Sequence, residues 1–208
     1  MPTPRRWWPL VTDVCVALFV VLYIVAAWLY PGGTRVDPAH NGFSLAQSYT
    51  CDLFEARGYG GRSNPGRPVA LAAAAVLAFG LAVLWWRVPS LTPEARRRRH
   101  VVRAAGVASG VFAPLVATSL HDLVINGAGL LAFVAFATTM SAYGRRAGPG
   151  LVALAALACA FAGLTFFIWK SRVGVLYLPG VQKVFVLLFL GWVLAMSRRL
   201  RQVSAAGT

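Results

Sequence analysis

Six apolar segments, each long enough to cross a lipid bilayer, follow one another along this chain of 208 residues. A membrane-spanning helix needs about 20 consecutive, mostly apolar residues. The segments cover residues 8–30, 68–86, 101–120, 123–143, 149–169 and 178–196. They predict an all-α integral membrane protein, a six-helix transmembrane bundle built as one domain over residues 1–201. We expect a disordered tail over 202–208.

The composition supports a membrane environment and argues against a nucleic-acid partner. Only 12% of the residues are charged and 58% are hydrophobic, whereas a soluble domain is usually about a quarter charged. The formal net charge of +14 would suit nucleic acid in a soluble protein. Here the arginines cluster at the ends of the apolar segments, as topology signals do. The expected partner is therefore membrane lipid, with no nucleic acid.

The distribution of basic residues predicts the orientation. Cytoplasmic loops of membrane proteins carry an excess of Lys and Arg. With both the N- and C-termini in the cytoplasm, the inner side holds thirteen of the 20 basic residues and the outer side seven. The thirteen are Arg5, Arg6, Arg87, Arg96, Arg97, Arg98, Arg99, Arg103, Arg145, Arg146, Arg198, Arg199 and Arg201. We expect a multi-pass protein of the cell inner membrane whose basic run Arg96–Arg99 anchors to acidic lipid head groups.

One long polar loop, residues 31–68, separates the first two apolar segments and holds three of the six acidic residues. Asn41 is placed to cap a short amphipathic helix over residues 42–56, with Ser44 and Gln47 as an alternative capping box. Several glycines follow this stretch and break regular structure. We expect the short helix to lie across the outer mouth of the bundle.

Small residues and one acid mark expected contacts between helices. Gly106 and Gly110 form a GxxxG pair, and Ala155, Cys159 and Gly163 form a similar ridge. Such spacing lets helix backbones approach closely in lipid, although it also occurs by chance in helices rich in Ala and Gly. Asp13, one turn inside the first segment, is expected to form a salt bridge with a basic inner residue, with a proton-relay role as the alternative.

Polar side chains near the outer ends of the segments are the candidates for chemistry. Such residues are costly in a membrane and are functional hypotheses by default. His121 and Asp122 occupy the tight junction between the third and fourth segments. The candidate catalytic residues are Asp52, His121 and Asp122, and the candidate binding residues are Glu55, Asn64, Asn126, Gln182 and Lys183.

These residues allow three interpretations. In the first, His121, Asp122 and Asp52, with Cys51 or His40, bind a metal ion that activates water, but no HxxxH or HxxE spacing supports this. We therefore expect no cofactor, and a metal near His121 and Asp52 is the minority alternative. In the second, a metal-free pocket holds a lipid head group. In the third, the polar residues cap helices and the cations extend to the membrane interface.

Several short motifs together resemble a known family. They are Tyr-Pro-Gly-Gly at 30–33, Ser-Tyr-Thr-Cys-Asp-Leu at 48–53, Asn-Pro at 64–65, His-Asp at 121–122 and Leu-Pro-x-x-Gln-Lys at 178–183. The chain resembles the bacterial membrane proteins of the domain of unknown function 998 family. These are distantly similar to Frag/DRAM/Sfk-type membrane proteins, some of which are tied to lipid or GPI-anchor handling.

This resemblance covers residues 8–196 and implies the six-helix fold and an outer-face site at the matching positions. The usual family form reads Ser-Asp-Leu-Gly where this chain reads Cys-Asp-Leu-Phe, which leaves the role of Cys51 open. The expected function is binding or modifying a lipid at an outer-face polar pocket. In an enzyme, Asp52 or His121 would be the general base and Lys183 would hold the anion. The alternatives are a structural or partner-organising membrane protein without catalysis and, third, a small-solute transporter. Transport is disfavoured because the sequence has no chain of intramembrane acids and no inverted repeat.

Overall fold

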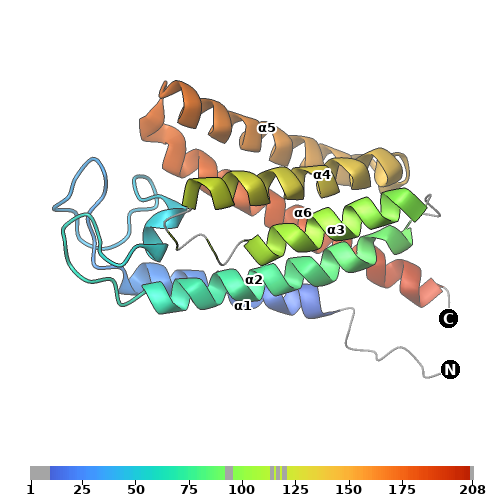
Figure 1. Ribbon diagram of the computed structural model, residues 1–208, viewed down its shortest axis with the longest axis horizontal. Coiled ribbons are helices and arrows are strands. Elements are labelled where there is room, and N and C mark those ends of the chain that lie inside the picture. The colour runs from blue at the N-terminus through green and yellow to red at the C-terminus, as the bar shows by residue number, and fades with distance from the viewer. Residues whose placement is uncertain (1–9, 92–95, 113–114, 116–117, 119–120, 207–208) are drawn as a thin grey trace.

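The computed structural model describes residues 10–91, 96–112, 115, 118 and 121–206, and the regular structure in these residues is helical (Figure 1). Six α-helices are described. Their bounds are α1 Val11–Leu29, α2 Arg67–Arg87, α3 Arg96–Phe112, α4 His121–Ala147, α5 Pro149–Ser171 and α6 Leu178–Ala206. The all-α class predicted from the sequence is confirmed.

Five stretches in the described part of the chain are long and apolar enough to cross a membrane. They are Val11–Leu29, Arg67–Leu91, Leu123–Gly144, Pro149–Ser171 and Val175–Val203. Helix α3 is not among them, because it has 17 residues and begins with four arginines. The C-terminal part of the expected third segment includes 113–114, 116–117 and 119–120, which lie outside the described residues. A sixth membrane crossing therefore remains a prediction.

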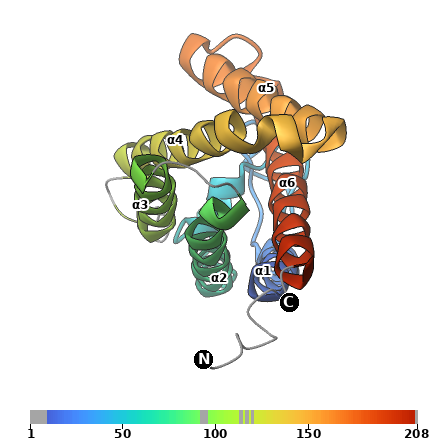
Figure 2. The same ribbon diagram turned by 90° about the vertical axis from the view of Figure 1, so that its right-hand side faces the viewer.

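The helices pack as three antiparallel hairpins, α1 with α2, α3 with α4 and α5 with α6. Contacts between α2 and α3 join the first two hairpins, and α6 contacts both α1 and α2. Helix α5 lies farthest from α1 and α2 (Figure 2). We call the end that carries the 31–66 loop the loop end. The opposite end, where α2 and α6 finish and α3 begins, is the arginine end (Figure 1).

Two tryptophans belong to the buried core of the bundle, and a glycine pair on α3 lets that helix approach α2 closely. Trp85 of α2 and Trp192 of α6 are fully buried, with ring centroids 5.7 Å apart. Gly106 of α3 lies so close to Trp85 that an added methyl group would overlap the base of its indole, and one at Gly110 would lie 3.0 Å from a backbone oxygen of α2. The close approach predicted from the GxxxG pair is confirmed. An added methyl at Gly163 would meet nothing within 4 Å, so the predicted ridge on α5 does not make a close approach there.

The prediction of a short α-helix over residues 42–56 is wrong. The loop contains only a 3-10 helix, η2, over Thr50–Phe54. Side-chain bonds close the segment before η2 into a local turn: the Ser48 hydroxyl accepts a hydrogen bond from the Ser44 N–H at 3.0 Å. Local bonds of this kind compete with the helical ladder. Gly42, with φ of 73°, also leaves the right-handed helical region.

The structure also tests three further expectations, two at the arginine end and one in the loop. Helix α6 continues to Ala206, so the tail expected to be disordered from residue 202 is helical up to that point. The Asp13 carboxylate of α1 pairs with Arg201 of α6, which confirms the predicted salt bridge. Asn41 does not cap a helix and instead accepts a hydrogen bond from Arg62 at 3.4 Å.

Candidate functional site at the loop end

The loop folds back onto the helix ends through a small apolar cluster. Leu53 of η2 is fully buried and packs with Ala26 and Tyr30 of the first hairpin and with Ala70 of α2. Burial raises the pKa of Tyr30 to about 12, so its hydroxyl keeps its proton and donates to the Gly33 carbonyl at 3.4 Å. Apolar burial of this kind holds η2 against the bundle.

Asn64, a predicted binding residue, uses its whole amide to fix this loop. Its side-chain nitrogen donates to the Leu53 carbonyl at 3.1 Å and the Glu55 carbonyl at 3.0 Å. Its side-chain oxygen accepts from the Gly66 N–H at 2.9 Å. Arg67 adds a bond to the Phe54 carbonyl at 2.8 Å. These bonds join the end of η2 to the start of α2.

Asp52 is a buried carboxyl group whose pKa lies close to neutrality. It is 5% exposed, and its Oδ2 accepts a hydrogen bond from the Tyr49 N–H at 2.7 Å. Burial raises its pKa to about 6, because removing a carboxylate from water disfavours the charged form. The Tyr49 hydrogen bond and the Lys183 charge oppose this shift without cancelling it. Asp52 can therefore take up and release a proton near physiological pH.

Lys183 reaches from α6 to the loop and fastens it. Its ammonium donates to the Ser48 carbonyl at 2.5 Å and to the Pro179 carbonyl at 3.2 Å. The same ammonium lies 5.3 Å from the centroid of the Phe43 ring, a cation–π distance. Phe43 in turn contacts Tyr30 edge-on. The sequence predicts Lys183 as an anion-holding group, whereas its described contacts are with the protein itself.

Three buried polar atoms near this cluster have no hydrogen-bond partner in the described part of the chain. They are the hydroxyls of Tyr23 and Thr50 and the side-chain oxygen of Gln182. The Tyr23 and Thr50 side chains interact with each other, but their hydroxyls do not reach the geometry of a full hydrogen bond. An unpaired buried polar group costs about 1–3 kcal/mol, so three at one end of the molecule call for a functional explanation.

Tyr23 and Thr50 are absent from the residues predicted by sequence. One signal could have indicated Tyr23: it is a polar aromatic residue in an apolar segment, seven residues before Tyr30 and therefore on the same face of the chain as Tyr30. Thr50 gives no such signal, because its position depends on how η2 packs. Gln182, by contrast, was predicted as a binding residue.

The remaining predicted residues are less closely tied to the cluster. Glu55 and Asn126 are exposed. His121 and Asp122 begin α4 at the loop end, but their side chains lie outside the described structure. Among the residues that are described, no group of three or more His, Cys, Asp or Glu side chains could hold a metal ion. A metal bound near His121 and Asp52 thus remains an untested hypothesis.

The chain was compared with protein-family models, with curated proteins and with solved structures, and none of them matches it. The resemblance described above therefore remains a prediction, and function has to be argued from the site itself.

Proposed function

We propose that the chain crosses the cell inner membrane six times, with both termini in the cytoplasm and the loop end on the outer face. Support comes from the arginines that end α2 and α6 and begin α3 at one end of the bundle. The positive-inside rule assigns such an end to the cytoplasm. In this arrangement the predicted segment 101–120 is the sixth crossing.

At the loop end, we propose that the protein binds the polar head group of a membrane lipid. One observation carries this proposal: the buried Asp52 carboxyl group lies at the same end as the unpartnered oxygens of Tyr23, Thr50 and Gln182. The Asp52 carboxylate and the Gln182 oxygen accept hydrogen bonds, and the Tyr23 and Thr50 hydroxyls can accept or donate, so the set suits a head group that carries hydroxyl or amine groups. Ligand donors would remove the cost of leaving them unpaired.

The pKa of Asp52 defines the chemistry that such a site can support. A carboxyl group with a pKa of about 6 accepts a proton from a bound hydroxyl or shares one with a bound amine near neutral pH. In the enzymatic form of the proposal, Asp52 is the general base of a lipid-modifying reaction. Lys183 has the positioning role of holding the loop over the site.

Arginines on the rim of the loop suit the phosphate of the same lipid. Arg35, Arg57 and Arg62 are all exposed. Within the described part of the chain, the guanidinium groups of Arg57 and Arg62 make only long hydrogen bonds, of 3.5 and 3.4 Å, to loop atoms. Guanidinium groups pair well with phosphate oxygens, so the rim and the buried acceptors together match a phospholipid with a hydroxyl or amine head group.

The test compares lipids retained by wild type, Asp52→Asn and Asp37→Asn in polymer-extracted membrane particles. Asp37 is an exposed loop acid and serves as the matched control. Mass spectrometry of the bound lipid should show one head-group class retained by wild type and Asp37→Asn but depleted about tenfold in Asp52→Asn. Incubation with that lipid class then reports any chemical change. A folded Asp52→Asn protein with the wild-type lipid content would refute lipid binding at this site.

A structural role without catalysis is the second candidate, and one observation favours it. Backbone carbonyls within or beside the loop accept hydrogen bonds from the side chains of Lys183, Asn64 and Arg67. Such bonds make the loop rigid, as expected of a surface that binds and orients a partner protein. This candidate predicts that no lipid is retained selectively. It also predicts that Lys183→Met abolishes capture of a membrane partner by chemical cross-linking at the loop while leaving α1–α6 folded.

A further inference from the structure

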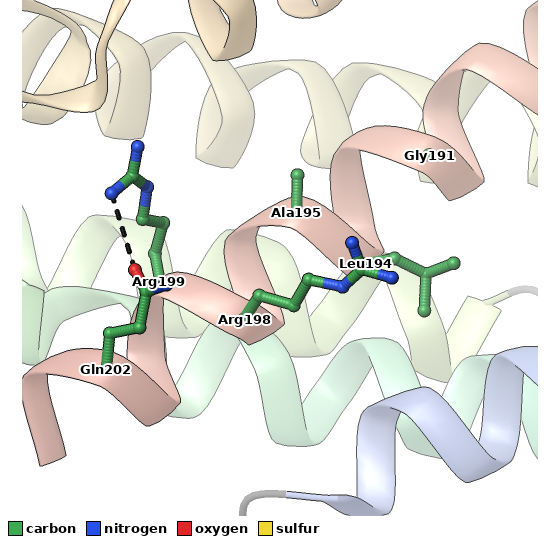
Figure 3. Close-up of a pocket in the computed structure, with 6 residues that line it drawn as sticks. All are labelled: Gly191, Leu194, Ala195, Arg198, Arg199 and Gln202. Atoms are coloured by element: carbon green, nitrogen blue, oxygen red, sulfur yellow. Dashed lines mark hydrogen bonds between the residues drawn. The ribbon is translucent and has the colours of Figure 1, made fainter. Parts of the chain in front are cut away.

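A groove runs along α6 at the arginine end of the molecule, far from the loop (Figure 3). Its volume is about 440 Å³. Small and apolar residues form one part of its wall and long polar side chains the other. The lining residues are Gly191, Leu194, Ala195, Arg198, Arg199 and Gln202. Because the groove lies within the apolar stretch Val175–Val203, it joins the expected membrane interior to the membrane surface.

The Arg199 guanidinium is held in place at the junction of α4 and α5. It donates to the Ala147 carbonyl at 3.3 Å. It also donates to the Gln202 side-chain oxygen at 3.3 Å (Figure 3). An added methyl group on Gly148, which has φ of 85°, would lie 3.6 Å from the guanidinium. A guanidinium fixed by two bonds loses little freedom when it binds an anion.

The surroundings of Arg199 are positive in two further ways. Arg198 is exposed and, within the described part of the chain, makes no hydrogen bond or ion pair. Helix α5 begins at Pro149 beside Arg199, and its N-cap residue Gly148 offers no side-chain cap. The first-turn N–H groups of a helix carry a partial positive charge. The described acid at this end, Asp13, is already paired with Arg201, so it does not neutralise Arg198.

We propose that this groove binds an anionic glycerophospholipid. The lipid phosphate pairs with the Arg199 guanidinium, and one acyl chain lies along Gly191, Leu194 and Ala195. The Arg198 side chain extends away from Arg199 along the groove (Figure 3) and adds positive charge there. A basic pocket beside membrane helices on the cytoplasmic side is the setting in which anionic head groups are recognised. Charge selects the head group, and the apolar wall selects a lipid over a soluble phosphate. This site is independent of the one proposed at the loop end.

The experiment titrates phosphatidylglycerol or phosphatidylcholine into the detergent-solubilised full-length protein and counts bound lipid by native mass spectrometry. The test variant is Arg198→Gln/Arg199→Gln. The control is Lys170→Gln/Arg172→Gln, which removes two exposed charges that lie outside the groove. We expect phosphatidylglycerol to bind wild type about tenfold or more tightly than phosphatidylcholine. The test variant should lose this preference, and the control should keep it within about threefold.

Two further measurements separate binding from folding and lipid from free phosphate. Arg198→Gln leaves the Arg199 bonds to α4 in place, and Ala195→Phe fills the apolar wall without changing charge. Each should weaken phosphatidylglycerol binding at least about threefold in a folded protein. Glycerol 3-phosphate at equal concentration should not displace the lipid. Equal losses in the test and control variants, unchanged binding in Ala195→Phe, or displacement by glycerol 3-phosphate would each overturn the proposal.

Discussion

Replacing Gly106 by alanine puts a methyl group where the base of the Trp85 side chain lies. The overlap falls on Cβ and Cγ of Trp85, atoms that cannot move away by a change at the tip of the side chain. Trp85 is also fully buried against Trp192, so the indole has no free space to turn into. One of the two helices, α2 or α3, must shift.

The expected cost follows from two opposing effects. Overpacking a close-packed core costs about 1–3 kcal/mol, whereas Ala in place of Gly stabilises a helix by up to about 1 kcal/mol. Gly106→Ala should therefore be destabilised by about 1–2 kcal/mol. Gly163→Ala is the matched control, because a methyl there meets nothing within 4 Å, and it should be neutral or slightly stabilised. The two variants should differ by about 2 kcal/mol.

Unfolding in mixed micelles of mild detergent and dodecyl sulfate, followed by circular dichroism, measures this difference. The free energy of unfolding of each variant is compared with that of wild type at the same lipid and detergent composition. Equal stability of Gly106→Ala and Gly163→Ala would refute the claim that α3 approaches α2 through Gly106.

Three more predictions concern charged groups. Because the pKa of Asp52 is raised to about 6 from an ordinary value near 3.8, the folded state binds this proton more tightly than the unfolded state does. The protonated Asp52 side chain therefore stabilises the folded state fully below about pH 4, and this stabilisation is lost as the pH rises through 6. Asp52→Asn should remove this pH dependence, which amounts to up to about 3 kcal/mol in the free energy of unfolding measured from pH 4 to 8. Lys183→Met should make the loop cleavable by an added protease, whereas Lys170→Met, at an exposed site, should not, and equal cleavage would contradict the fastening role. Arg201→Gln should destabilise more than the double variant Asp13→Asn/Arg201→Gln, because the single change leaves a half-buried carboxylate unpaired; simple additivity in a double-mutant cycle would argue against this coupling.

Local signals in the sequence explain why most helix positions could be predicted. The start of α5 at Pro149 and of α6 at Leu178 agree with the predicted segments, since an apolar length and a proline in the first turn depend on neighbouring residues alone. The C-terminus of α6 was missed because its arginines resemble a solvated tail. They remain helical where Arg199 contacts both α4 and Gln202.

The sequence predicted members of the candidate site only where a polar side chain is costly to place in or beside the membrane. Asp52, Gln182 and Lys183 were predicted because polar groups at helix ends are expensive. Their roles were not predictable, because the use of Lys183 depends on the Ser48 carbonyl, 135 positions earlier in the chain. The unpartnered hydroxyl of Tyr23 becomes visible only once the loop is placed over α1.

The bond between Lys183 and the Ser48 carbonyl also imposes an order on biogenesis. The loop is synthesised early, before any of α2–α6, but its anchor on α6 emerges from the ribosome last. Until α6 is inserted, the Ser48 carbonyl lacks its hydrogen bond from Lys183, and the loop that joins α1 to α2 is not held by α6. The loop is therefore fully held only after the last helix has been inserted. In a chain that stops before α6, proteases would have access to the segment around Ser48.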